Sequence, residues 1–287
     1  NFTDYDFEGS NLSIIIDALA YNTYITAYNT NMAANECFLD SSTLRENVVS
    51  LARNIGYVPR SRRSSRARIS FNISEITETV TATVRAGIIC NGSAANTSYI
   101  FSIPEDITVP VVDGVAVFDN IEIYEGTLIN QNFTVNTSQF NQRYILSNSF
   151  IDTSTIRVKV KPDESSSSTV TYQQIDNIVG VTSTSSSYLL QEIEDERYEL
   201  IFGDNVIGKK LSNDNYITVS YIITSGKDGN GASEFSFIGN IIDQDGATID
   251  ASNFSLVTTE ESSRDGDEIE SISSIKYYAP RIYSSQY

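Results

Sequence analysis

The fold is decided where residues 68–76 read RISFNISEI, because apolar side chains take every second position there. Ile69, Phe71 and Ile73 alternate with polar residues, and this period of two places them on one face of a β-strand. Apolar residues of the preceding segment recur instead at spacings of three and four. We therefore expect a β domain to begin here and a helical segment to precede it.

The segment before residue 60 carries two apolar stripes at helical spacing. Ser10 is a good N-cap for a first helix that can persist toward Cys37, and a second helix is expected from Asp40 or Ser41 to Gly56. These features predict a helical hairpin. Its stripes are Leu12, Ile15, Ile16 and Leu19 on the first helix, and Leu44, Val48, Leu51 and Ile55 on the second. Two short helices cannot hide such stripes alone, so the protein's own β domain or another chain must cover them.

The rest of the chain is mainly a series of short strands. Asp113-Gly114 lies between alternating segments and predicts a hairpin turn, and the serine run 165–168 predicts a flexible loop. Regularly spaced short strands predict sandwich-like or barrel-like packing. From Asp265 through Ala279 the pattern is helical again. The expected class is α+β: an N-terminal helical hairpin, mainly antiparallel β domains and a C-terminal helix. The expected domains are residues 1–60 (helical assembly segment), 61–164 (β domain), 165–264 (second β domain) and 265–287 (helical segment).

Charge is distributed unevenly. The formal net charge is -18, yet the residues through Arg68 contain seven basic and seven acidic side chains, so the whole excess lies after them. A field of that sign disfavours nucleic acid and anionic membranes as partners of the later domains. No window approaches the roughly 20 apolar residues of a membrane span. We expect a soluble protein with no membrane span.

One basic cluster, PRSRRSSRAR at residues 59–68, stands out from this acidic background. Nucleic-acid binding is one interpretation. Aromatic residues that would stack on single strands are missing inside the cluster, so a contact with protein carboxylates, which the later domains themselves supply, is favoured. The arginines expected to contact protein are Arg60, Arg62, Arg63 and Arg66.

Motifs that could carry chemistry fail on their details. Gly203, Gly208 and Lys209 have the spacing of a phosphate-binding loop, but Lys210 stands at the hydroxyl position and more strand follows, so a β-hairpin turn is favoured. With no histidine, imidazole-dependent triads and the common zinc sites are excluded. The acids around residues 243–250 and 264–268 lack the ligand set of an EF-hand, although a surface calcium site stays open. We therefore expect no catalytic residue, no cofactor and no metal.

The cysteines and the possible N-glycosylation motifs say little about where the protein is located. Cys37 and Cys90 can form one bridge at most, and a reducing compartment is the simpler interpretation. The Asn-X-Ser/Thr matches are expected by chance in a chain this rich in Asn, Ser and Thr. No signal peptide is visible, and both ends of the sequence are expected to be cut.

Three stretches together resemble a known family. Residues 2–64, from FTDYDFEGS to YVPRSRRS, closely resemble the N-terminal region of the baseplate wedge proteins of T-even-like contractile-tailed bacteriophages. ERYELIFGDNVIGKKL at 196–211 and YITVSYIITSGKDGNGASEFSF at 216–237 resemble the FGD-x-x-x-G and G-x-x-G-N signatures of the wider baseplate J-like family. EIESISSIKYYAPRIYSSQ at 268–286 resembles the helix that follows them.

This resemblance implies a structural, non-enzymatic role in the virion tail, with assembly in the host cytoplasm. It implies that the N-terminal helices join a second copy of the chain and another wedge subunit in a helical bundle. Neighbouring baseplate, hub or sheath-initiating proteins are further implied partners, and wedges form a ring that opens when the sheath contracts. The helical stripes would then be covered by other chains, and residues 165–264 would be the J-like domain.

Two other classes stay open. A carbohydrate-binding or receptor-binding β protein of a phage tail is the first, although tryptophan is absent. The second is a glycosidase that uses the acids of QEIEDERYEL at 191–200, where alternation places Glu192, Glu194 and Glu196 on one solvated face.

Overall fold

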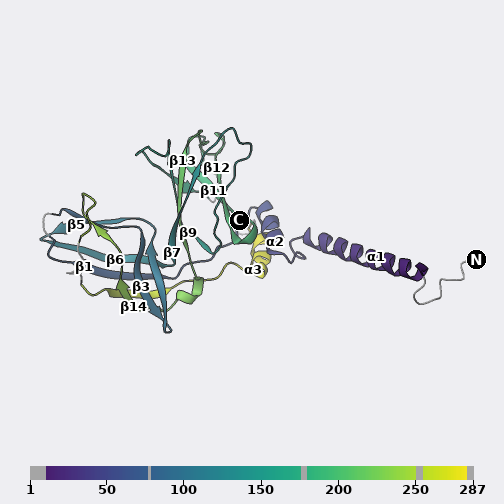
Figure 1. Cartoon of the computed structure of the whole chain (residues 1–287), viewed down its shortest axis with the longest axis horizontal. Coiled ribbons are helices and arrows are strands. Elements are labelled where there is room, and N and C mark those ends of the chain that lie inside the picture. Colours follow the sequence, from purple (N-terminus) through teal and green to yellow (C-terminus); the bar gives the residue numbers. More distant parts are fainter. Residues whose placement is uncertain (1–10, 77–78, 176–179, 250–254, 283–287) are drawn as a thin grey trace, which may run out of the picture. The chain divides into compact units, whose positions relative to one another are not determined.

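A computed structural model describes residues 11–76, 79–175, 180–249 and 255–282 (Figure 1). They form two compact units: one contains the residues before Arg60 and after Glu270, and the other runs from Arg60 to Glu270. The first is helical and the second is built of mainly antiparallel sheets. The predicted α+β class, with helices at both ends of the chain, is confirmed.

In the helical unit, α1 (Asn11–Glu36) and α2 (Arg45–Asn54) meet at a carboxylate. Glu36 accepts hydrogen bonds from the Ser42 hydroxyl at 2.6 Å and from the backbone N–H of Thr43 at 2.8 Å. These contacts hold residues 37–44 in turns, so α2 begins four residues later than expected. Its end is as predicted, because Gly56 has φ +81 and closes the helix. Ser10, the expected N-cap of α1, lies outside the described residues.

The core of the helical unit is formed by α2 and the C-terminal helix α3 (Ile272–Tyr278), which continues into a 3-10 turn at Ala279–Arg281. Ser271 caps α3 by accepting a hydrogen bond from the N–H of Ser274. The expected helix from Asp265 is therefore shorter at its start. The buried members of this core are Val48, Val49, Ala52, Ile275 and Ala279.

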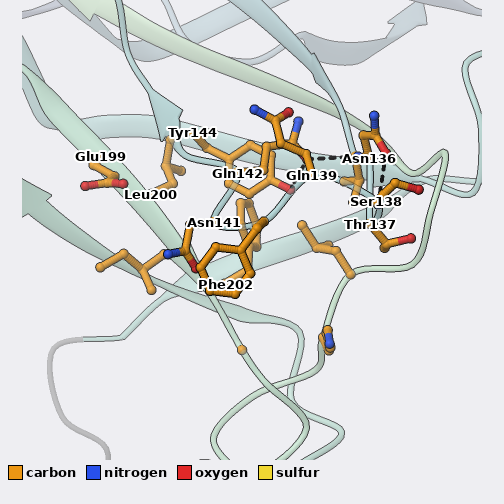
Figure 2. Close-up of a pocket in the computed structure, with 16 residues that line it drawn as sticks. Asn136, Thr137, Ser138, Gln139, Asn141, Gln142, Tyr144, Glu199, Leu200 and Phe202 are labelled. Carbon is orange, nitrogen blue, oxygen red and sulfur yellow. Dashed lines mark hydrogen bonds between the residues drawn. The ribbon is translucent and has the colours of Figure 1, made fainter.

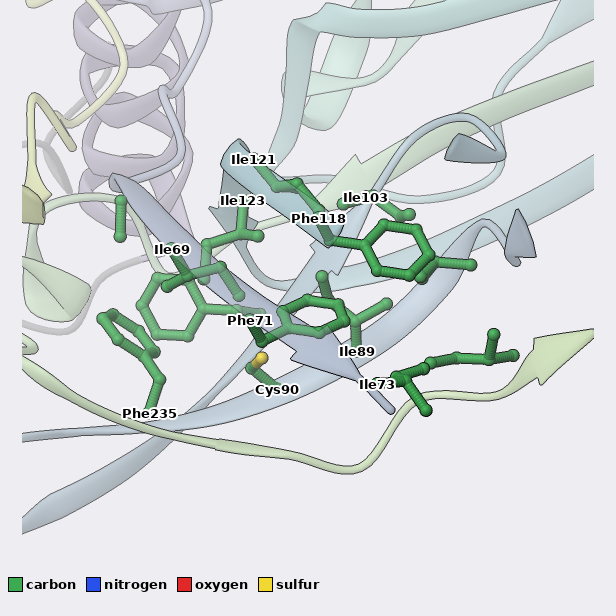
Figure 3. Close-up of a cluster of buried hydrophobic side chains, with 14 of the residues drawn as sticks. Ile69, Phe71, Ile73, Ile89, Cys90, Ile103, Phe118, Ile121, Ile123 and Phe235 are labelled. Atoms are coloured by element: carbon green, nitrogen blue, oxygen red, sulfur yellow. The ribbon is translucent and has the colours of Figure 1, made fainter. Parts of the chain in front are cut away.

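The first sheet begins with the strand that contains Ile69, Phe71 and Ile73. In β1 (Arg66–Ile73) the buried side chains alternate with more exposed ones, as its period of two predicts. Phe71 stacks on Phe118 with ring centroids 4.9 Å apart (Figure 3). Asp113 and Gly114 have φ +51 and +76 and form the predicted hairpin turn. The other strands are β2 (Thr81–Val84), β3 (Gly87–Ala94), β4 (Thr97–Ile103), β5 (Ile107–Val112), β6 (Val115–Glu125), β14 (Glu234–Phe237), β15 (Ile241–Ile242) and β16 (Thr258–Arg264).

The second sheet is inserted between β6 and β14 of the first. Its strand order is β7-β13-β9-β10-β11-β12-β8, and its one parallel pair joins β10 to β11. The expected boundary at 164/165 falls inside this sheet, so the two β domains do not follow one another along the chain. Its strands are β7 (Thr127–Thr134), β8 (Tyr144–Ile145), β9 (Ile151–Lys161), β10 (Val170–Gln174), β11 (Ser187–Glu192), β12 (Tyr198–Phe202) and β13 (Tyr216–Ile223).

Candidate assembly surfaces

Exposed apolar side chains follow one another along α1. Ile15, Ile16 and Leu19 are more than half exposed, and Leu12 is half-buried. From Leu12 to Glu36 no side chain of the helix is buried. The other helices of its own unit therefore do not bury this stripe.

Three threonines follow this stripe along α1, and their hydroxyl groups already make hydrogen bonds within the helix. Thr23, Thr26 and Thr30 each donate a hydroxyl hydrogen bond of 2.8 Å to the carbonyl four residues earlier. A threonine bonded in this way needs no further partner for its hydroxyl hydrogen. These residues can therefore be buried against another helix without leaving a donor unpaired.

The expected stripe of α2 is only partly available to a partner. Val48 is fully buried against the α3 core, and Ile55 packs on the same cluster. Leu51 is half-buried, whereas Leu44 is exposed. This placement corrects the expectation for Val48: its partner is α3, whose apolar residues come from a distant part of the sequence.

The arginine cluster is largely engaged within the chain. Residues near Arg60 pair with residues near Asp267: Arg63 and Asp267 form a β-bridge, and Arg60 and Asp267 form a 2.7 Å ion pair. Arg62 pairs with Glu268 at 2.9 Å. Arg66 lies 4.0 Å from Glu122 and 5.3 Å from the Tyr124 ring centroid. Arg60, Arg62 and Arg66 thus pair with carboxylates of the later part of the chain, as expected. Because these pairs occupy their charges, the further expectation that these three arginines bind a partner chain is corrected.

Arg63 differs from its neighbours. Its backbone joins the bridge, but among the described residues its exposed side chain makes no ion pair. It is the one arginine of the predicted set whose charge is still available to another chain.

The G-x-x-G-N signature fixes the place where this arginine segment enters the β unit. Asn230 accepts hydrogen bonds from the Ser65 hydroxyl and the Gly266 N–H and donates one to the Gly266 carbonyl. Gly229 is required by close approach, since a Cβ there would lie 2.6 Å from the Cγ of Glu125. The motif therefore joins segments more than 150 residues apart and serves structure.

Glu125 is the buried carboxylate of this junction. It accepts hydrogen bonds from the Thr224 hydroxyl at 2.5 Å and the Ser225 N–H at 3.0 Å. Burial nevertheless raises the pKa of Glu125 above its ordinary value. The two donors satisfy the carboxylate, which marks it as a structural group.

The FGD-x-x-x-G loop turns back on itself. Asp204 accepts hydrogen bonds from the N–H groups of Val206 and Ile207, and Gly203 lies directly against Gly208, leaving no room for a side chain. The predicted β-hairpin is wrong, because β12 pairs with β11 and β8 and the next strand, β13, pairs elsewhere. The Asn205 N–H donates to the Gly208 carbonyl within the loop, and the Gly208 N–H donates to the Thr182 carbonyl outside it, so these backbone groups are used inside the chain.

The acidic run does not form the expected solvated face. Glu192 is buried, and Glu194–Glu196 form a 3-10 turn between β11 and β12. Glu199 is also buried and is held by the Arg143 guanidinium through two hydrogen bonds of 2.7 Å. A carboxylate neutralised in this way is a poor general acid, which weighs against the glycosidase interpretation.

The described residues contain neither a metal-binding cluster nor a helix that could span a membrane. Within the described ranges, no group of three or more acidic or cysteine side chains is arranged to hold a metal ion. Asp243 accepts the N–H groups of Asp245 and Ala247, so it acts as the predicted turn former. No helix among the residues described combines the length and apolar character that a bilayer span requires.

The second sheet carries an open groove of about 490 Å³ (Figure 2). One wall is the loop 135–142 and the other is the end of β12 from Leu200 to Gly203. Phe140 stands at the tip of the loop with 90% of its side chain exposed. Sequence reasoning missed this groove, because the loop and β12 lie about 60 residues apart in the chain.

Sequence reasoning also missed Glu36 and two tyrosines of α1, Tyr21 and Tyr24. Tyr21, Tyr24 and Tyr28 are each more than half exposed. The tyrosines are spaced by three and four residues, but Tyr21 and Tyr24 lie off the stripe of Leu12, Ile15, Ile16 and Leu19.

Comparison with known proteins agrees with the predicted resemblance. Residues 1–57 match the family described as baseplate wedge protein gp6-like, helical domain. Over 254 residues, or 82% of the chain, the sequence is 28% identical to the baseplate wedge protein gp6 of Enterobacteria phage T4. The matched region is 37% of that protein, so the chain spans just over a third of the relative's length. Similarity to a phage baseplate wedge protein, inferred above from motifs alone, is thereby confirmed.

Proposed function

We propose that this chain is a structural subunit of a phage tail baseplate wedge, located in the virion, and that it assembles through α1. The observation that carries the proposal is an apolar helix of 26 residues with no buried side chain between Leu12 and Glu36. A soluble protein covers such a surface by association. The similarity to a baseplate wedge protein supports the same assignment.

The distribution of apolar residues on α1 supports a bundle of more than two helices. Two sets of residues repeat with spacings of four and three, and they are offset by two positions, which is about 200° around a helix. The sets therefore face nearly opposite directions, and one neighbour cannot cover both. The first set is Leu12, Ile16, Leu19, Thr23, Thr26 and Thr30; the second is Ile14, Ala18, Tyr21, Ile25, Tyr28 and Met32.

Charge on the helix fits this arrangement. Asp17 and Glu36 are the only charged residues of α1, and the remaining polar positions are mostly Asn and Thr. The Glu36 carboxylate is already occupied at the start of α2. We infer that a second copy of this chain lies on one face and another wedge subunit on the other. Ring formation around the hub, and its opening when the sheath contracts, are further parts of the proposal that rest on the resemblance.

Ile16→Asp tests the assembly surface. An unpaired carboxylate at an apolar helix contact costs several kcal/mol, so the variant should be a monomer at concentrations at which the wild type associates. Size-exclusion chromatography with light scattering reports the mass. Asn29→Asp is the matched control, because it adds the same charge to α1 outside both sets. Equal masses for the wild type and Ile16→Asp would contradict the proposal.

The β unit offers less support for the receptor-binding alternative. Of the aromatic residues that line the groove, Tyr144 and Phe202 pack edge to face with ring centroids 5.3 Å apart, while Phe140 of the loop 135–142 is exposed. The edge-to-face pair presents no broad aromatic platform of the kind that sugars stack on. We propose no catalytic role for any residue.

A further inference from the structure

The second sheet is closed along one part of its seam. Its two edge strands are β7 and β8, and the Gln131 side chain of β7 bridges them. Its amide nitrogen donates to the Ile145 carbonyl at 3.0 Å, and its oxygen accepts from the Ser147 N–H at 2.9 Å. Beside Ile145 and Ser147, hydrogen bonds from this side chain replace the backbone hydrogen bonds that would otherwise join β7 to β8.

The next part of the seam is open, and the groove described above lies there (Figure 2). β8 ends at Tyr144, which pairs with Leu200, so β12 continues beyond its partner to Phe202. The chain before Tyr144 leaves the sheet, with Asn141 at φ +55. No strand of the described chain lies beside Phe202 on that side.

The direction of the Phe202 backbone follows from the neighbouring hydrogen bonds. Arg197 uses its carbonyl toward β11, accepting from Ile193, while Tyr198 uses its carbonyl toward β8, accepting from Leu146. Backbone groups alternate sides along an antiparallel strand. The N–H and C=O of Phe202 therefore face the groove, and the ladder offers them no partner within the described residues.

The opposite wall of the groove is held in place before any partner arrives. Gln142 donates to the Thr134 carbonyl at 2.8 Å and accepts from the Asn136 N–H at 2.8 Å. Asn136 in turn accepts from the N–H of Ser138. A preformed wall reduces the entropy lost on binding.

We propose that this groove binds an extended segment of a partner protein, which adds a short antiparallel strand to β12 beside Phe202. Paired N–H and C=O groups at an open strand end are complementary to another peptide backbone. The segment would continue the line of β8. The side chain of the bound residue opposite Phe202 would lie on the same face of the sheet as Phe202 and Leu200. The side chain of the next bound residue would lie on the other face, beside Ile201. Apolar residues should therefore alternate along the bound segment.

An enclosed small molecule fits the groove less well. Sites for such ligands bury most of the ligand surface, whereas this groove is open to solvent. The strand site lies on the β unit, so it is independent of α1 and goes beyond the function proposed above.

Selection of short random peptides on the chain of residues 1–287 tests the strand site. Ile201→Asp places a charge in the groove, and Ile207→Asp is the control, since both isoleucines are 39% exposed and Ile207 does not line the groove. Selected peptides should have alternating apolar residues and bind Ile201→Asp at least about tenfold more weakly than Ile207→Asp.

The backbone contact is tested on the selected peptides themselves. N-methylation of the residue opposite Phe202 should remove a ladder hydrogen bond and abolish binding, while methylation one residue away should be tolerated. Peptides that bind both variants equally, or that tolerate methylation at every position, would overturn the proposal. So would selection that yields no Ile201-dependent peptide, or binding of an oligosaccharide in the groove. The mass of the chain in solution is measured in parallel. A failure of peptide binding with unchanged association would count against the strand site alone, and not against assembly through α1.

Discussion

The first sheet and helix α1 are both rich in apolar residues, yet they use them in opposite ways. In the sheet, residues such as Ile69 and Phe118 are fully buried within one unit. In α1, Ile16 and Leu19 are as apolar and more than half exposed. The difference shows that a strongly apolar segment is not always part of its own chain's core. Stability of the β unit and association through α1 should therefore respond to different substitutions.

Phe118→Ala should have the largest effect on the free energy of unfolding. Its ring is fully buried against Phe71, so its loss should cost about 3–5 kcal/mol. Leu19→Ala on α1 should change the stability of the monomer by no more than about 0.5 kcal/mol. Denaturant unfolding of both variants at low protein concentration measures the contrast. Similar losses for the two would show that α1 has a core of its own.

Asn230→Ala should have an intermediate effect. The substitution removes three hydrogen bonds that join Ser65 and Gly266 to the G-x-x-G-N motif, and their loss should cost about 1–3 kcal/mol. Asn213→Ala, which removes exposed hydrogen bonds to Thr137, is the control and should cost less. Thermal unfolding of both compares them, and equal shifts in Tm would remove the special role of the motif. Neither variant should alter association through α1.

The smallest effect is expected from acid at the start of α2. Hydrogen bonds from Ser42 and Asn47 hold the pKa of Glu36 well below its ordinary value. A carboxyl group whose folded-state pKa is depressed stabilises the folded state above its unfolded pKa and loses that contribution as the pH falls toward the folded value. The first turn of α2 should therefore loosen only below the ordinary range of glutamate.

NMR titration of the Thr43 amide checks this expectation. In the wild type its chemical shift should move at a pH below the ordinary glutamate range, and in Glu36→Gln that transition should be absent. A transition at the ordinary glutamate pKa would mean that the junction between α1 and α2 is open in solution.

Local features of this fold could be predicted from sequence, and long-range pairings could not. The alternation at Ile69–Ile73 and the turn at Asp113-Gly114 depend on neighbouring residues, and both predictions are confirmed. Insertion of the second sheet depends on strands such as β7 and β13, which pair across about 80 residues. Periodicity carries no information about such partners.

The same contrast between local and long-range features holds for the candidate site residues. The apolar stripe of α1 could be predicted, because its spacing depends only on residues of the same helix. Val48 could not, since the α3 residues that bury it lie more than 220 positions away. The arginines near residue 60 were expected to contact carboxylates of the later domains, and they do, but which carboxylates they pair with could not be predicted. The groove beside Phe202 was invisible for the same reason.

Amide hydrogen exchange at several protein concentrations distinguishes a helix covered by association from one covered within the chain. We expect amides of β1 to be protected at every concentration, and those of α1 to become protected only as the chain associates. Protection of α1 at the lowest concentration, with the mass of a monomer, would contradict it, because the chain would then cover this helix by itself.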